Sequence, residues 1–196
     1  MPNDQLRVLA ADEDQAALAR TASLLDELGH EVTATAVDLA QVTEAIAREE
    51  PDLSIVVVHD DDEHALDLIE EINAFASGPV IAMQAEEQPD FTRRAAERGI
   101  YAAVRGGDTE ALQTAIEIAL RRNAEYRAAT EQVDRLETAL ERRAVIERAK
   151  GMLMERHGVS DREAFDRIRA FARSNNRTVV DVAGDVCSGE QVLGAS

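Results

Sequence analysis

The chain has 196 residues, of which 45% are hydrophobic and only 3% aromatic, and its formal net charge is −18. This length suits one medium-sized domain and a smaller one, with cores built from aliphatic side chains. Because no run of about 18 apolar residues occurs and the first residues lack the basic and then apolar order of a signal peptide, we expect a cytoplasmic protein without a membrane partner.

Short apolar runs alternate with amphipathic helical patterns in residues 1–108, which predicts an α/β domain. We predict strands at 6–11, 31–35, 53–58, 79–83 and 101–104. Helices are predicted at 15–28, 39–48, 65–76 and 90–98. The third strand is almost continuously apolar, as in strands buried on both faces. Such an order predicts a doubly wound, parallel, five-stranded sheet, in which ligands bind at the carboxyl ends of the strands.

The order of these elements, with Asp12 and Glu13 after the first strand, resembles the receiver domain of response regulators. The resemblance implies that this acidic pair could hold magnesium, and no other cofactor is expected. The phosphoacceptor position of the family, at the end of the third strand, falls on Val57. Its Ser/Thr position falls on Gln84 and its Lys-Pro position on Gly106-Gly107. Because valine cannot accept a phosphoryl group, we predict a pseudo-receiver that works without phosphorylation.

The acidic loop that follows the third strand leaves an alternative open. With the register shifted by three residues, Asp60 would be the phosphoacceptor, and Asp12 and Glu13 could complete a magnesium site with hard oxygen ligands. That register would extend a buried strand with His59, which is unfavourable. His59 and His64 bracket the loop, and we interpret them as surface histidines rather than as ligands of a transition metal. No metal site is therefore predicted there.

A long helix without a stop signal is predicted after the receiver-like domain, because residues 109–150 contain neither glycine nor proline. Its apolar residues recur at spacings of three and four, as in a coiled-coil seam. The seam consists of Leu112, Ile116, Ala119, Asn123 and Tyr126 and, after one three-residue step, of Ala129, Val133, Leu136 and Leu140. We predict that residues 109–141 pair with the same segment of a second copy in a parallel homodimer. The alternative is that this linker folds back on its own receiver-like domain.

Residues 142–189 contain three short helical patterns, and 190–196 form a tail. The first pattern continues to His157 and ends at Gly158, because glycine tolerates a positive φ. The second begins at Ser160, which forms a capping-box pattern with Glu163. The third begins at Thr178, after a polar turn. Helices this short cannot each bury a face alone, so we predict a small all-α domain of three packed helices.

This segment also carries several spaced motifs of one family. They are Ala149-Lys150-Gly151-Met152-Leu153-Met154, His157-Gly158, Ala164-Phe165, Ile168-Arg169 and Val182-Ala183. Together they resemble the ANTAR domain, a three-helix RNA-binding module of bacterial antitermination regulators. The resemblance implies binding to paired hexaloop stem-loops in nascent messages, which favours the antiterminated RNA over the terminator hairpin.

The charge distribution agrees with an RNA partner for the C-terminal segment. Residues 1–140 hold 30 acidic and 11 basic residues, whereas residues 141–196 hold 9 and 10. Lys150 is the only lysine beside 20 arginines, and a compact ammonium suits a phosphate or a cluster of carbonyls. The alternative is a lysine that lies along a helix surface with its charge in water. We predict RNA contacts by Lys150, Arg143, Arg169, Arg173, Asn175, Asn176 and Arg177.

Together these patterns predict a non-catalytic RNA-binding antitermination regulator, controlled by a protein partner, a ligand or its own dimerisation. The alternative is a phosphorylation-dependent response regulator that acts through Asp60 or through protein contacts. A DNA-binding regulator is less favoured, because the third helix is acidic and rich in valine. No enzyme is predicted, since the sequence lacks a phosphate-binding glycine loop, a nucleophile motif and a metal triad. We interpret the single Cys187 as a core thiol.

Overall fold

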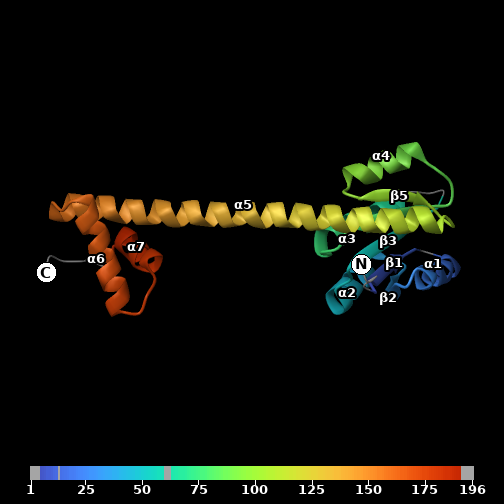
Figure 1. The fold of residues 1–196 in the computed structure, drawn as a ribbon, viewed down its shortest axis with the longest axis horizontal. Helices are drawn as coiled ribbons and strands as arrows, with labels where there is room; N and C mark the ends of the chain where they lie inside the picture. The colour runs from blue at the N-terminus through green and yellow to red at the C-terminus, as the bar shows by residue number, and fades with distance from the viewer. Residues whose placement is uncertain (1–4, 13, 60–62, 191–196) are drawn as a thin grey trace. The chain divides into compact units, whose positions relative to one another are not determined.

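The computed structural model describes residues 5–12, 14–59 and 63–190 (Figure 1). The chain divides into two compact units, residues 1–127 and residues 128–196. One helix, α5 (Thr109–His157), begins in the first unit and ends in the second. Each unit has its own hydrophobic core, so each is described by itself.

The first unit is an α/β domain. Its strands are β1 (Arg7–Ala11), β2 (Glu31–Ala36), β3 (Leu53–Val58), β4 (Val80–Gln84) and β5 (Ala102–Arg105). Its helices, besides the start of α5, are α1 (Gln15–Glu27), α2 (Leu39–Glu49), α3 (Glu63–Phe75) and α4 (Pro89–Glu97). The strands pair in parallel in the order β2-β1-β3-β4-β5. This confirms the predicted doubly wound sheet.

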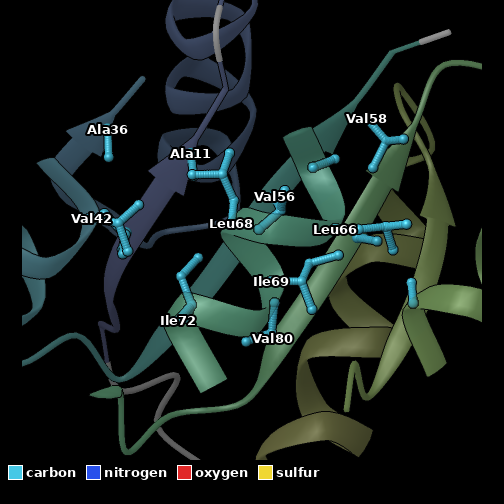
Figure 2. Close-up of a cluster of buried hydrophobic side chains, with 14 of the residues drawn as sticks. Ala11, Ala36, Val42, Val56, Val58, Leu66, Leu68, Ile69, Ile72 and Val80 are labelled. Atoms are coloured by element: carbon cyan, nitrogen blue, oxygen red, sulfur yellow. The ribbon is translucent and has the colours of Figure 1, made fainter. Parts of the chain in front are cut away.

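Alternate residues of the strands supply two separate cores, as the two-residue period of a strand requires. Val56, Val58 and Val80 pack with α2, α3 and α4, and Figure 2 shows side chains of α3 gathered with those of β3 and β4. Leu53 and Ile55 face the other core, which α1 and the first turns of α5 complete. Leu112, Ile116 and Ala119 of α5 are buried there, so the prediction that they belong to a coiled-coil seam is wrong: they pack on the sheet. Because helices cover both faces of the parallel sheet, the loops that follow the strands come together at the carboxyl ends of the strands.

The second unit is a helical domain. It consists of the later part of α5 together with α6 (Asp161–Ser174) and α7 (Val179–Ser188). The helix α5 continues past Gly151 to His157, so that the predicted linker and the first helix of the C-terminal module are one helix. Gly158 follows with a φ of 65°. The three helices share one buried cluster of Ala149, Leu153, Ala164, Ile168, Ala172, Val182, Ala183 and Val186.

Candidate nucleic-acid interface

Side-chain caps fix where α6 and α7 begin. The Ser160 hydroxyl accepts a hydrogen bond from the Glu163 amide, and the Glu163 carboxylate accepts one from the Ser160 amide. The Thr178 hydroxyl accepts from the Asp181 amide in the same way. These caps satisfy amides that the first turn of a helix leaves free. The caps fix the turn between α5 and α6 and the turn between α6 and α7. Several of the predicted RNA-contacting residues lie in the turn between α6 and α7.

Lys150 lies between α5 and α6 rather than in open solvent. Its side chain is only 10% exposed, and its ammonium donates to Asp161 Oδ1 at 2.7 Å and to Glu147 Oε2 at 2.9 Å. Glu147 is three residues earlier on the same helix, whereas Asp161 belongs to the first turn of α6. The hydrogen bonds to Asp161 and Glu147 raise the pKa of Lys150 above its ordinary value. The lysine therefore carries a full charge that two carboxylates of the protein already neutralise.

The residues predicted to contact RNA from the turn between α6 and α7 interact with nearby residues of the same unit. The Asn175 side-chain amide donates to the Phe171 carbonyl at 2.9 Å and so caps the end of α6. Asn176 has a φ of 51°, in the left-handed region that asparagine tolerates better than most residues. Arg177 forms an ion pair with Asp185 of α7, which raises the pKa of Arg177 and lowers that of Asp185. All three residues shape the turn, and all three are exposed.

The remaining predicted contacts are exposed arginines. Arg169 and Arg173 are one helical turn apart on α6, and Arg143 is on α5. Within the described parts of the chain, none of the three forms an ion pair. Guanidinium groups without an internal partner are free to meet phosphate, for which their planar fork is well suited.

A groove on the second unit joins Arg143 to residues that the sequence did not single out. It measures about 700 Å³. Its lining consists of Asp134, Arg135, Thr138, Ala139, Arg142, Arg143, Ile146, Glu147, Phe165 and Val180. Arg169 and Arg173 of α6 do not line it. The adjacent pair Arg142-Arg143 is the signal for this groove in the sequence. Phe165 gave no such signal, because its spacing places it on the apolar side of α6.

The carboxyl ends of the strands in the first unit form the second candidate site. Val57, at the end of β3, is half-buried and pairs with Met83 of β4. The side chain of Gln84 is buried and donates to Thr92 of α4 at 3.2 Å. A cavity of about 430 Å³ lies here, lined by Val57, His59, Gln84, Gly106, Gly107 and residues of α1. The receiver positions are therefore together in space, but their side chains are not those of a phosphorylation site.

Asp12 is almost fully buried, with 1% of its surface exposed. Its Oδ1 lies 2.8 Å from His59 Nε2 and accepts from the Asp14 amide at 2.8 Å. Among the described residues no hydrogen bond reaches Oδ2. Magnesium is commonly bound through one or two carboxylates and keeps several waters. A magnesium site at Asp12 and Glu13 stays a prediction, since Glu13 lies outside the described residues.

Two predictions for this edge concern positions beyond the described residues. Glu13, the second member of the acidic pair, and Asp60, the alternative phosphoacceptor, both lie outside them. Within the described parts of the chain, no group of three His, Cys, Asp or Glu side chains is placed to share a metal ion. Likewise, no helix of these parts combines the length and the apolar character that a membrane span requires.

Comparison with known proteins gives similarities for both units. The model of the ANTAR domain matches residues 134–186. Over 178 residues the chain is 32% identical to the transcriptional regulatory protein PdtaR of Mycobacterium tuberculosis, in strain CDC 1551 / Oshkosh and likewise in strain H37Rv. This alignment covers 90% of the chain and 87% of PdtaR.

Solved structures resemble the first unit. One is the signal receiver domain of a modulated diguanylate cyclase from Desulfovibrio desulfuricans G20, with a TM-score of 0.55 and 17% identity over 63% of this chain and 99% of that one. Another is a CheY-like receiver domain protein from Methanospirillum hungatei JF-1, with a TM-score of 0.52 and 19% identity over 63% of this chain and 99% of that one. At such identities the likeness concerns the receiver fold alone.

Proposed function

Because this chain belongs to the family of ANTAR-domain response regulators that includes PdtaR, we propose that it binds RNA and regulates transcription by antitermination. The target is a pair of hexaloop stem-loops in a nascent message. Binding stabilises these stem-loops, and the competing terminator hairpin then forms less often. The effect is one of mass action: the protein shifts the RNA toward the structure that it binds.

The observation that carries this proposal is the set of exposed arginines on the second unit. Arg143, Arg169 and Arg173 have no ion-pair partner among the described residues, although the whole chain has a charge of −18. Positive groups that release counterions from phosphate supply a large part of the affinity for nucleic acids. RNA loops also offer unpaired bases, which proteins read by stacking and by hydrogen bonds to base edges.

Lys150 has a different part in this proposal. Its ammonium is held by Asp161 and Glu147, so a phosphate would have to displace a carboxylate of the protein. We assign it the role of a positioning residue that keeps α6 against α5. Loss of Lys150 would then weaken RNA binding by moving the arginines of α6 rather than by removing a contact.

The protein is proposed to act as a dimer through α5. Val133, Leu136 and Leu140 are 52%, 54% and 65% exposed, and they are spaced as in a coiled-coil seam. A second copy of the same segment would remove these side chains from water. Two RNA-binding units would then meet two loops of one message, and the second contact would profit from the high effective concentration that the first creates.

Control of this regulator is proposed to be independent of phosphorylation. Val57 cannot carry a phosphoryl group, and Gln84 and Gly106 lack the hydroxyl and the amine of an active receiver. A protein partner, a ligand or the dimerisation of α5 would then provide the control.

A binding competition tests the proposed function. Fluorescence anisotropy would compare a two-hexaloop RNA, a single-loop RNA and duplex DNA of equal length and charge. We expect the two-loop RNA to bind about 100-fold more tightly than the single-loop RNA, with weaker binding to DNA. Replacing Arg169 and Arg173 together by glutamine should reduce the salt dependence, by about 0.7 in log–log slope for each lost contact to single-stranded phosphate. Equal affinities for all three nucleic acids would refute the proposal.

A further inference from the structure

Phe165 is set apart from the other apolar residues of the second unit. The unit contains two aromatic residues, Phe165 and Phe171. Phe171 packs against the buried cluster of the three helices, whereas Phe165 does not belong to that packing. Phe165 is half-buried and lines the groove beside α5. An aromatic ring held at a groove wall and not used by the core is free to receive a flat partner.

The groove around Phe165 combines an apolar floor with positive charge. Ile146 and Val180 line it together with Phe165. Arg142 and Arg143 lie beside them, both exposed and, in the described parts of the chain, without an ion pair. Of the charged residues in the lining, Glu147 is bound to Lys150 and Arg135 is paired with Glu131. Arg142 and Arg143 together with Asp134 leave the groove with one net positive charge.

We propose that an unpaired base of the target RNA stacks on Phe165, while Arg142 and Arg143 contact the phosphates next to it. This inference rests on the proposed function and names where the second unit reads a loop. Stacking on an aromatic side chain suits every base, because each base has a flat π-face. The groove of about 700 Å³ lies within the roughly 300–1,000 Å³ typical of pockets that bind small molecules, so that an everted nucleotide fits.

Charge decides between this occupant and a second copy of the chain. In the parallel pairing proposed for α5, a second copy would bring its own Arg142 and Arg143 to the same height along the helix, and like charges in contact oppose binding. An RNA loop brings one phosphate for each nucleotide together with exposed bases. The groove can bind both: Arg142 and Arg143 can contact the phosphates, and the half-buried Phe165 ring can stack on a base.

The test uses full-length protein and RNA that carries 2-aminopurine at one loop position at a time. In the wild type, we expect one position at which protein binding strongly quenches the fluorescence through stacking. Phe165→Leu should abolish this quenching and weaken binding about tenfold, within the range found for loss of one stacked base. Phe165→Trp should restore both. Replacing Arg142 and Arg143 together by glutamine should lower the salt slope by about 1.4.

Phe171→Leu is the matched control, because it makes the same change in the core instead of the groove. Its melting temperature should fall, whereas that of Phe165→Leu should change little; below both transitions Phe171→Leu should retain the quenching. Quenching that persists in Phe165→Leu, or is absent at every loop position of a bound RNA, would overturn the stacking site and leave the proposed function intact. A wild type that binds no loop RNA would overturn both.

Discussion

Lys150 joins two helices through one charge. The ammonium contacts Asp161 of α6 and Glu147 of α5, and 10% of the side chain is exposed. A single cation between two carboxylates is strongly favoured to stay protonated. A guanidinium is wider and flat, which gives a physical reason for a lysine here in a chain that otherwise uses arginine.

Replacing Lys150 by methionine should therefore lower the melting temperature of the second unit, because the carboxylates of Glu147 and Asp161 are left facing each other. Circular dichroism would measure the loss at about pH 8. The pKa of Lys150 is raised on folding, so its contribution is complete below the ordinary lysine value of about 10.4 and is lost as the pH rises through the higher, folded-state pKa. The difference between wild type and Lys150→Met should accordingly shrink above about pH 11. A difference that does not shrink above that pH would show that the ion pairs contribute nothing.

Residues that depend on tertiary contacts were the hardest to anticipate. The pairing of Lys150 with Glu147 follows from helical spacing, but Asp161 comes after a turn and meets the lysine only once α6 has packed. Phe165 and Phe171 both fit the apolar pattern of α6, yet only Phe171 packs against the core. Periodicity tells which residues share a face; it does not tell where the face ends and a groove begins.

At the scale of elements, the middle of α5 is exposed to solvent over about six turns. Residues 124–144 are all exposed, including Val133, Leu136 and Leu140 of the seam. An isolated helix gains little stability from propensity alone, and most helical stability in proteins comes from packing an apolar face. A second α5 is the partner that the spacing of the seam favours.

Leu136→Glu should abolish the dimer, because each seam would bury a carboxylate against its copy, at a cost well above the roughly 1 kcal/mol of a surface contact. Sedimentation equilibrium at tens of micromolar should give a dimer for the wild type and a monomer for the variant. Arg127→Glu is the control, since Arg127 is exposed, lies on the side of the helix away from the seam and does not line the groove beside Phe165. A monomeric wild type, or a dimer that survives Leu136→Glu, would contradict pairing through α5.

Most elements followed directly from local patterns in the sequence. The strands of the first unit are short and mainly apolar, and glycines such as Gly29 and Gly99, both with positive φ, mark helix ends that were predicted. Most strand and helix ends in the first unit lie within one residue of the prediction, and two differences are larger. The helix α3 begins at Glu63 rather than at residue 65, and α5 merges the linker with the first C-terminal helix, because a single glycine at 151 does not break a long helix.

At the scale of the whole molecule, a receiver-like fold is combined with a family of RNA-binding modules, but the phosphorylation chemistry is missing from the described residues. Val57 is at the position predicted for the phosphoacceptor, and the His59 ring lies within hydrogen-bond distance of one carboxylate oxygen of Asp12. The loss of the aspartate could be read from the sequence alone. The contact between His59 and Asp12 could not, since it depends on how the loops after β1 and β3 meet.

Treatment with acetyl phosphate and magnesium should leave the mass of the intact protein unchanged, because the β3 position offers no carboxylate. A receiver domain with an aspartate at this position serves as the positive control. An added phosphoryl group that disappears in Asp60→Ala would instead establish the acidic loop as the phosphoacceptor and contradict a phosphorylation-independent regulator.

The most direct test of the account is single-round transcription on a template whose leader contains two hexaloop stem-loops, the second overlapping a terminator. Read-through should increase with the concentration of wild-type protein, whereas Leu136→Glu should have little effect and Arg127→Glu should resemble the wild type. Read-through that does not change with wild-type protein, at concentrations that saturate the two-loop RNA, would contradict antitermination by a dimer of this chain.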